Sequence, residues 1–318
     1  MSDLPIISEI SIKPTFGGHE KFVFRYGWLK KGVDALANSP AVFSDDNALV
    51  VLGVGKNMVR SIRHWCLATG LFEETRVSGT ARGLQLSQLA TRLVIDGGWD
   101  PYLEDIGTLW LLHWQITTNL SRAAIWYLTF CHFFEAEFTK KQLTVFIGKQ
   151  LERQGIVTTS GAIERDVDVC LRMYVTAIRV VGKGVSEETL DCPIAELNLI
   201  SFTPEDNVYH FNIGPKSTLP TAIFGYSLLK FLSAIAADRR SVSIDECIYR
   251  PGSPGQVFKL DENSVIEYLE SLEELTAGGL QLQETAGLRQ LYLQHDTSDW
   301  FSETAQGLLG RHYVGPRY

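Results

Sequence analysis

The fold of the N-terminal third is decided by residues 53–70, which read GVGKNMVRSIRHWCLATG. Apolar residues recur at i, i+3 and i+7 in Val59, Ile62 and Cys66, so they share one face of a helix. The glycines before this pattern form a tight turn, and the glycine after it stands at the C′ position of a helix. We therefore predict a helix over residues 56–69 with one buried face and one polar face.

Two shorter helices are predicted before this helix, and a β-hairpin is predicted after it. Residues 26–37 carry an apolar stripe at i, i+4 and i+7. A short second helix is expected to begin at Ser44 as its N-cap, with Asp45 and Asp46 in its first turn, and to carry Ala48, Leu49 and Leu52. Residues 71–77 and 83–86 are strand-like and are joined by a short loop. Three short helices followed by a hairpin form the element order of a winged helix-turn-helix.

Helical patterns also dominate the rest of the chain, so the expected fold class is mainly α with small β-hairpins (α+β). A chain of 318 residues is long enough for two or three domains of about 100–200 residues each. We divide it into an extended lead-in at 1–18, a winged helix-turn-helix at 19–95, a helical middle domain at 96–190 and an acidic, winged-helix-like module at 191–318.

The composition is that of an ordinary globular protein, with 45% hydrophobic and 21% charged residues. No apolar run reaches the ~18 residues that a membrane helix needs, and the N-terminus lacks the pattern of a secretory signal. The five cysteines lie far apart and form no CxxC pair, which favours reduced thiols over disulfides or a zinc site. We therefore expect a cytoplasmic protein without a membrane partner.

Charge is distributed unevenly along the chain, whose net charge is −8. Residues 20–83 contain nine Lys or Arg against six acids, whereas residues 261–305 contain ten acids and a single base, Arg289. The basic end is the candidate surface for a polyanion. The acidic end is expected to be solvated surface or a contact for another protein.

The polar face of the predicted helix at 56–69 has the side chains that a nucleic-acid contact needs. We expect Lys56, Asn57, Arg60, Arg63 and His64 to point outward. Arginine can bind guanine and asparagine adenine through two hydrogen bonds each, while lysine binds phosphates. The alternative interpretation is a basic helix face that is only solvated.

Several acidic and histidine side chains near the basic region could do acid–base or metal chemistry. His19 and Glu20 are adjacent and can act as a general base or bind a metal, although such a pair is more often a hydrogen-bonding unit. Asp34 could bind a divalent metal while Lys30 holds a phosphate, or the two could form an i, i+4 ion pair. The acids of residues 99–105 could bind Mg²⁺, but helix capping is favoured.

No nucleotide cofactor is expected, because residues 53–57 lack the glycine spacing and the Ser/Thr of a Walker motif. The chain also contains no GxSxG motif, no HExxH motif and no dinucleotide fingerprint. Sequence chemistry alone therefore leaves open whether the protein is an enzyme.

Four long strings together resemble a bacterial family of proteins of unknown function, DUF4007. They are GHEKFVFRYGWLKKGVD at 18–34, LGVGKNMVRSIRHW at 52–65, GWDPYLED at 98–105 and PGSPG at 251–255. The resemblance covers nearly the whole chain. It implies a component of a DNA phosphorothioation (antiphage) system, encoded beside a cysteine desulfurase, an ATPase and a sulfurtransferase. Specifically, it implies the component of that system that nicks DNA.

The resulting hypothesis is a protein that binds double-stranded DNA and nicks one strand so that sulfur can be inserted into the backbone. Hydrolysis would be assisted by Mg²⁺ or Mn²⁺, and the partners would be the sulfur-transfer and ATPase components. The candidate catalytic residues are His19, Glu20 and Asp34. The candidate DNA-binding residues are Arg25, Lys30, Lys31, Lys56, Asn57, Arg60 and Arg63. The alternatives are a non-catalytic adaptor that docks a partner enzyme and a transcriptional regulator.

Overall fold

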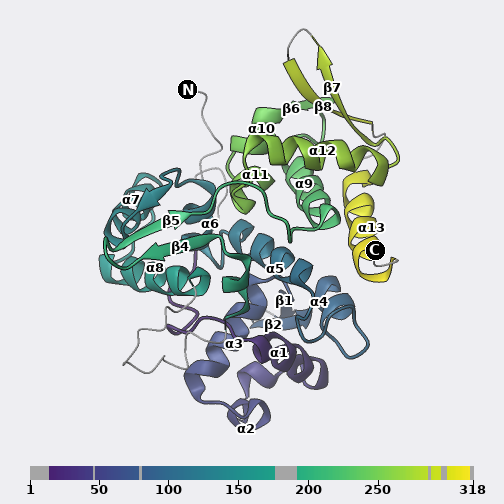
Figure 1. The fold of residues 1–318 in the computed structure, drawn as a ribbon. Coiled ribbons are helices and arrows are strands. Elements are labelled where there is room, and N and C mark those ends of the chain that lie inside the picture. Colours follow the sequence, from purple (N-terminus) through teal and green to yellow (C-terminus); the bar gives the residue numbers. More distant parts are fainter. Residues whose placement is uncertain are drawn as a thin grey trace. The chain divides into compact units, whose positions relative to one another are not determined.

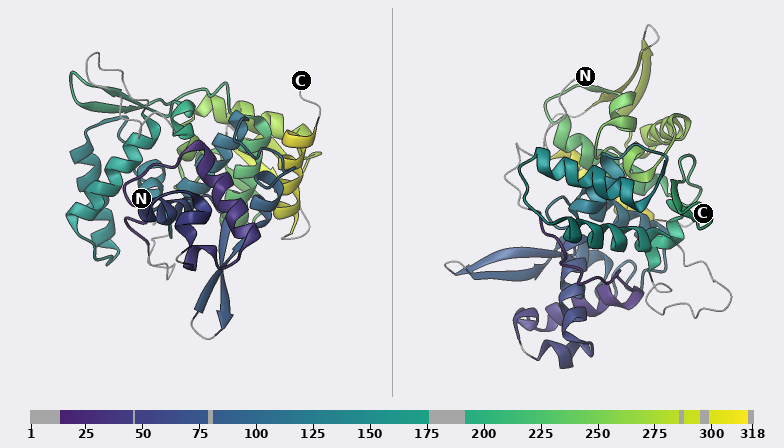
Figure 2. Two further views of the ribbon diagram at one scale, coloured as in Figure 1. Left: turned by 90° about the horizontal axis from the view of Figure 1, so that it is seen from below. Right: turned by 90° about the vertical axis from the view of Figure 1, so that its left-hand side faces the viewer.

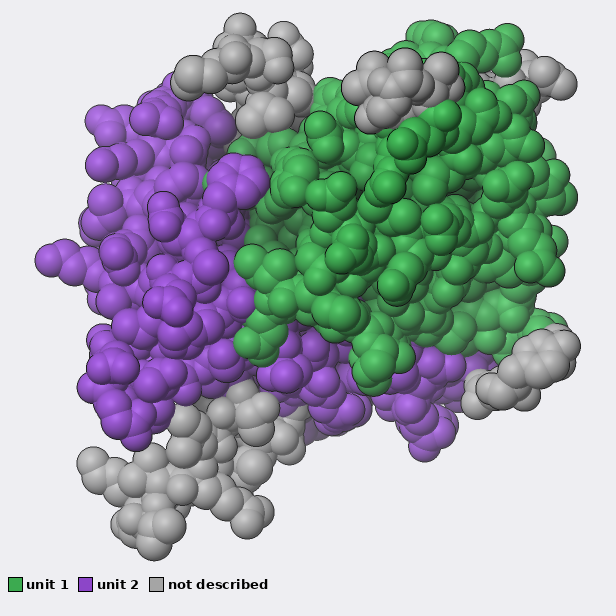
Figure 3. All heavy atoms as spheres, turned by 45° about the horizontal axis from the view of Figure 1, so that its top comes forward, with its two compact units in different colours: residues 1–4, 130–132, 212–318 green, residues 5–129, 133–211 purple. Residues whose placement is uncertain are grey.

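The computed structural model confirms the α+β class expected from the sequence, with many helices and small antiparallel sheets (Figure 1). It describes residues 14–45, 47–78, 81–175, 192–285, 288–294 and 299–315. Contacts divide the chain into two compact units (Figure 3). Unit 2 is drawn from Pro5–Thr129 and Phe133–Phe211, and unit 1 contains Phe130–His132 and Asn212–Tyr318. The division at residues 95 and 190 stays a prediction.

The N-terminal part of unit 2 has the element order predicted from the sequence. The elements are α1 (Tyr26–Asn38), the 3-10 turn η2 (Val42–Ser44), α2 (Ala48–Leu52), α3 (Lys56–Ala68), β1 (Phe72–Ser78) and β2 (Ala81–Leu86). The hairpin is antiparallel, with Phe72 opposite Leu86, and Figure 2 shows it extending away from the helices. Its identity as a DNA-binding winged helix stays a prediction.

The predicted cap of α2 is wrong. Ser44 ends η2 and does not cap α2, which begins after Asn47. The carboxylate of Asp45 accepts the backbone N–H of Asn47 at 2.8 Å, a local turn that competes with helix formation. The helix therefore starts later and without a side-chain cap.

The core of unit 2 contains the tryptophan-rich segment and the helices α4 (Gln88–Leu93), α5 (Ile106–Thr118) and α6 (Ala124–Cys131). Trp65 and Trp126 are buried here with their ring centroids 5.4 Å apart. Asp105 caps α5 by accepting the N–H of Gly107 at 2.8 Å, and the Asp100 carboxylate accepts two further backbone N–H groups. Asp105 thus caps the next helix, as favoured above, and Asp100 fixes the turn before it.

The remaining elements of unit 2 form a small helix and sheet layer. They are β3 (Glu137–Phe138), α7 (Lys140–Arg153), α8 (Ser160–Tyr174), η3 (Pro193–Leu197), β4 (Ile200–Thr203) and β5 (Val208–Phe211). The strands form one antiparallel sheet in the order β3-β5-β4, and α8 packs against α7 and β4. Thr139 begins α7 with a reciprocal capping box to Gln142.

Unit 1 contains five helices and one sheet among its described residues. The elements are α9 (Thr221–Ile235), β6 (Ser241–Ser243), α10 (Ile244–Tyr249), α11 (Pro254–Phe258), α12 (Glu262–Leu275), β7 (Leu280–Thr285), β8 (Leu288–Leu293) and α13 (Trp300–Val314). The strand order is β6-β8-β7, with both pairs antiparallel. None of the described helices has both the length and the hydrophobicity needed to cross a membrane.

Lys259 is an unusual residue in the interior of unit 1. It ends α11 in a left-handed conformation with φ of 53° and is only 5% exposed. Its ammonium group donates to the Phe130 carbonyl at 2.9 Å and lies over the Phe130 ring. Burial lowers the pKa of Lys259 to about 7. The five cysteines are also buried, and all are free, as the sequence predicted.

Close packing in unit 1 depends on Gly225 in α9. A Cβ atom at this position would lie 2.5 Å from Leu272 Cδ2 of α12 and 2.8 Å from Leu308 Cδ1 of α13. Both distances are far below van der Waals contact, so only glycine lets these helices approach this closely.

Gly225→Ala is therefore expected to lower the free energy of unfolding by about 1–3 kcal/mol, because the added methyl group overpacks the core. Gly307→Ala in α13 is the matched control, since a Cβ atom there would meet nothing within 4 Å. This control should stabilise the protein by about 0.5–1 kcal/mol through helix propensity. Urea denaturation measures both, and equal effects at the two positions would refute the packing argument.

Candidate functional site

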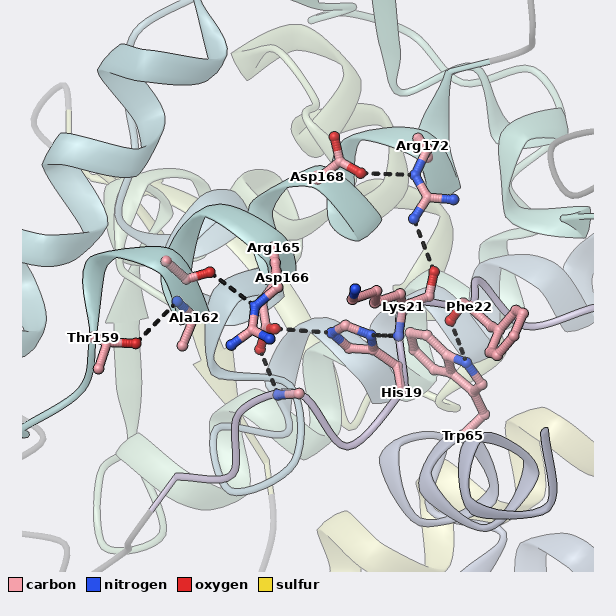
Figure 4. Close-up of polar contacts among 12 residues, drawn as sticks. His19, Lys21, Phe22, Trp65, Thr159, Ala162, Arg165, Asp166, Asp168 and Arg172 are labelled. Carbon is pink, nitrogen blue, oxygen red and sulfur yellow. Dashed lines mark hydrogen bonds and ion pairs between the residues drawn. The ribbon is translucent and has the colours of Figure 1, made fainter. Parts of the chain in front are cut away.

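The chain before α1 forms a loop that is held by a carboxylate of α8 (Figure 4). Oδ2 of Asp166 accepts the N–H of Gly17 at 2.9 Å, and Oδ1 lies 3.1 Å from Nε2 of His19. Asp166 is 3% exposed and His19 is 1% exposed. One buried carboxylate therefore fixes two points of the loop.

The hydrogen bonds of His19 define its tautomer. Nδ1 accepts the backbone N–H of Lys21 at 3.0 Å, so the ring proton lies on Nε2 and faces Asp166. The ring stacks on Trp65 at a centroid distance of 6.2 Å. Nδ1 is thus hydrogen-bonded, whereas the buried Nε2 faces the Asp166 carboxylate at 3.1 Å without forming a hydrogen bond of good geometry. His19 would have to release one of these contacts to act as the general base predicted above, and in this structure it anchors the loop.

The loop backbone is strained at the residues that follow this anchor. Glu20 and Lys21 have φ values of 50° and 69°, the left-handed region that L side chains seldom adopt. Each such residue costs on the order of 1–3 kcal/mol and persists only where surrounding contacts enforce it. Here the enforcing contacts are those made by Asp166 and His19.

A cavity of about 280 Å³ opens between this loop, α3 and α8. It is lined by Gly17, His19, Glu20, Lys21, Asn57, Arg165 and Asp166. Lys21, Asn57 and Arg165 are exposed, whereas the His19–Asp166 pair forms the buried part of the wall. The cavity thus combines two cations, an amide and a half-buried carboxylate, a set that can bind an anion and exchange a proton.

The polar face of α3 is exposed at its N-terminal end, as predicted. Lys56, Asn57 and Arg60 are exposed, and no ion pair of Lys56 is found among the described residues. Arg60 lies 3.3 Å from the carboxylate of Glu20, and its side chain remains 56% exposed. Exposed ion pairs contribute at most about 1 kcal/mol, so this arginine can exchange its carboxylate for a phosphate.

Arg63 is less available for DNA binding than the sequence implied. Its guanidinium lies 3.5 Å from Glu74, which also binds Arg122 at 2.7 Å. Burial lowers the pKa of Arg63, but its side chain is still 39% exposed. The guanidinium stays charged, because the ordinary pKa of arginine lies far above neutrality.

The prediction that His64 points outward is wrong. His64 is 6% exposed, and its ring contacts His19 at a centroid distance of 5.8 Å. Helical periodicity puts His64 near Arg60, but the loop before α1 covers this side of the helix. A Cβ atom on Gly18 would lie 2.5 Å from Nδ1 of His64, which shows how closely the loop approaches. Burial lowers the pKa of His64 to about 3.

The candidate cations of α1 have partners inside the protein. Lys30 lies 2.6 Å from both Asp34 and Asp96, and its side chain is 11% exposed. Burial lowers the pKa of Lys30, but its two carboxylate partners outweigh this and raise it. Lys31 donates to the Leu52 carbonyl at the end of α2. The Lys30–Asp34 pair is therefore the i, i+4 ion pair given above as an alternative.

Arg25 and Asp34 complete the set of predicted residues. Arg25 precedes α1 and lies over the Trp28 ring, 5.5 Å from its centroid. Asp34 does not line the cavity described above. The structure thus brings His19, Glu20 and Asn57 together at one cavity and places Asp34 in a separate ion pair.

The described side chains do not fit a preformed metal site. Among them, no group of three or more His, Cys, Asp or Glu side chains could hold a metal ion. Both oxygens of Asp166 are already engaged, which leaves Glu20 as the available carboxylate of the cavity. Mg²⁺ can bind through one carboxylate when water and substrate phosphates supply the other ligands. We therefore assign no reaction step to a metal.

Sequence reasoning missed Asp166 and Arg165, although Asp166 bonds to the loop across 149 residues of sequence. One signal was present in the pattern of α8. Asp166 lies between Ile163 and Cys170 on the apolar face of this helix, where an unpaired carboxylate would be costly. A charged residue on such a face indicates a buried partner elsewhere in the chain.

Comparisons with known proteins place these observations in a wider context. The family model DUF4007, described as a protein of unknown function, matches residues 16–313. A crystal structure of SspB is 32% identical with a TM-score of 0.84, and the match covers 95% of this chain and 88% of that chain. A magnesium ion-bound crystal structure of SspB is 31% identical with a TM-score of 0.85, covering 98% and 91% respectively. No curated protein matches the chain.

Proposed function

Because the chain belongs to the DUF4007 family, we propose that it is the DNA-binding component of a phosphorothioate modification system. Its similarity to SspB over nearly the whole length of both chains supports a common role. In this role the protein binds double-stranded DNA and nicks one strand, so that sulfur can enter the backbone. Its partners are the sulfur-transfer and ATPase components of the same system.

The observation that carries this proposal is the exposed polar surface at the start of α3. Lys56, Asn57 and Arg60 lie within one turn and a half of helix and are all exposed. Asn57 also lines the cavity that Glu20 faces. A duplex held on α3 would therefore place its backbone next to a half-buried carboxylate.

The reaction of the proposal is hydrolysis of one phosphodiester. Water adds to phosphorus, one P–O ester bond breaks, and the leaving oxygen takes up a proton from solvent. Glu20 is the carboxylate placed to accept the proton of that water, because its side chain is 30% exposed in the cavity. His19 and Asp166 keep the loop that carries Glu20 in its left-handed conformation.

A plasmid assay tests the nicking part of the proposal. We expect the purified full chain to convert supercoiled plasmid into the relaxed form with Mg²⁺ or Mn²⁺ and not with EDTA. Glu20→Gln should remove nicking while duplex binding persists, because the amide cannot take up a proton. Plasmid that stays supercoiled under every metal condition would contradict the nicking role.

Duplex binding is tested separately by fluorescence anisotropy across a salt titration. Lys56→Ala should weaken binding and reduce the slope of log K against log salt by about 1, because one phosphate contact is lost. Lys149→Ala is the control, since Lys149 is an exposed lysine of α7 away from the α3 surface. Equal effects of the two substitutions would show that α3 is not the DNA surface.

An adaptor role is the second candidate, and the surface of α12 favours it. This helix exposes five glutamates, Glu262, Glu267, Glu270, Glu273 and Glu274. Such a surface can dock a basic partner protein. Capture of the sulfur-transfer component that survives DNase treatment, in the absence of any nicking, would favour this role. A transcriptional regulator would instead bind one promoter tightly rather than short, frequent motifs.

A further inference from the structure

The acidic side chains of the cavity beside α3 have partners within the protein, whereas its basic side chains have few. Its two acids have partners within the protein: Asp166 accepts the N–H of Gly17 and lies 3.1 Å from Nε2 of His19, and Glu20, although accessible, lies 3.3 Å from the exposed Arg60. Among the described residues, its two cations have fewer partners. No hydrogen bond from the Lys21 ammonium group is found within the described part of the chain. The cavity therefore presents unused positive charge.

Arg165 has most of its guanidinium available. Its Nε donates to the Gly161 carbonyl one turn earlier at 2.9 Å, which orients the side chain along α8. Among the described residues, no partner is found for its two terminal nitrogens. A guanidinium held in this way is suited to bind two oxygens of one phosphate.

The cavity is large enough to admit a phosphate group, and its position is suited to one from a strand bound on α3. Its volume of about 280 Å³ corresponds to roughly nine water molecules at ~30 Å³ each. Asn57 belongs both to this wall and to the exposed surface of α3, so the cavity directly adjoins the proposed duplex site. Figure 4 shows Lys21, Arg165 and the His19–Asp166 pair gathered at the same loop.

We propose that this cavity binds one backbone phosphate of the DNA strand held on α3, with Lys21 and Arg165 as the phosphate-binding side chains. The inference rests on the proposed DNA-binding function and extends it to α8, which lies more than a hundred residues away in sequence. It also gives the His19–Asp166 pair a purpose, since this pair holds Lys21 opposite Arg165. His19 and Asp166 are positioning residues in this account.

Arg165→Ala tests the proposal in the full chain by anisotropy with duplex DNA. We expect about tenfold weaker binding, in line with the loss of one charge-assisted contact. The slope of log K against log salt should fall by about 1. Arg165→Lys should restore the slope, because the charge is kept, but only part of the affinity, because the two-oxygen contact is lost. Arg165 is exposed, so the variants should keep the thermal stability of the parent protein.

A second measurement locates the contact. In a set of duplexes that each carry one neutral methylphosphonate, one position should weaken binding by the parent protein. The same methylphosphonate should not weaken binding by Arg165→Ala any further, because that variant has already lost the contact. If Lys56→Ala weakens binding and Arg165→Ala does not, the cavity proposal is overturned and the DNA-binding function stands. If the parent protein binds no DNA at all, both proposals are overturned.

Discussion

Asp166→Ala is expected to lower the free energy of unfolding by about 3 kcal/mol and to abolish the proposed DNA function. The substitution removes the acceptor of the part-buried Gly17 N–H and leaves the buried Nε2 of His19 without its facing carboxylate. Each unpaired buried donor costs about 1–3 kcal/mol. Without the carboxylate, the left-handed conformation of Glu20 and Lys21 is held only by the local hydrogen bonds of the loop and by the bond from Arg172 to the Lys21 carbonyl, so we expect these side chains to shift in the cavity.

Urea denaturation and anisotropy with duplex DNA measure the two effects. Glu164→Ala is the matched control on the same helix, because Glu164 is an exposed carboxylate of α8. Substitutions of such surface residues usually change the free energy of unfolding by less than about 0.5 kcal/mol. Asp166→Asn should be intermediate: its amide oxygen can still accept from Gly17, but its NH₂ group would face the proton of His19. Equal losses for Asp166→Ala and Glu164→Ala would show that Asp166 does not hold the loop.

The second large effect expected is a rise in stability with pH that depends on Lys259. The pKa of Lys259 is lowered from 10.5 to about 7 in the folded protein, chiefly by burial. Between these two pH values the unfolded chain holds the proton and the folded chain does not, so raising the pH favours the folded state. At 1.36 kcal/mol per unit, the full gain is on the order of 5 kcal/mol, and it is absent below about pH 7.

Comparison with Lys259→Met isolates this effect from other titrating groups. Both proteins are unfolded with urea at intervals from neutral pH to about pH 10. The free energy of unfolding of the parent chain should increase with pH relative to that of Lys259→Met. Methionine has nearly the same length and carries no charge, so the variant lacks this part of the pH dependence. Parallel pH profiles for the two proteins would mean that Lys259 keeps its proton in the folded state.

Local structure in the N-terminal region could be predicted well from the sequence. Helix α3 was expected over 56–69 and spans Lys56–Ala68, because its apolar spacing and flanking glycines are local signals. The start of α2 was missed, since the turn at Asp45 depends on one side-chain hydrogen bond that periodicity does not contain. The α+β class followed from the density of helical patterns.

The candidate site could be predicted only in part, because it is built from distant segments. His19, Glu20 and Asn57 were chosen for their residue types and line one cavity. Asp166, which holds the loop at Gly17 and His19, is not a local feature of the sequence. The burial of His64 shows the same limit: α3 alone would expose this ring, and only the close approach of Gly18 buries it. Lys30 and Lys31 were chosen for their charge, yet their ammonium groups stabilise the protein internally.

The grouping of Phe130–His132 with Asn212–Tyr318 bears on how this architecture can evolve. A gene fragment that began at residue 212 would encode Lys259 without the carbonyl that its ammonium group binds. The Lys259 amine would then lie in an apolar interior without its hydrogen-bond acceptor, so we expect that such a fragment does not fold stably on its own. Recombination at the boundary near residue 211 is therefore disfavoured, and we expect the two halves of the protein to be inherited together as one gene.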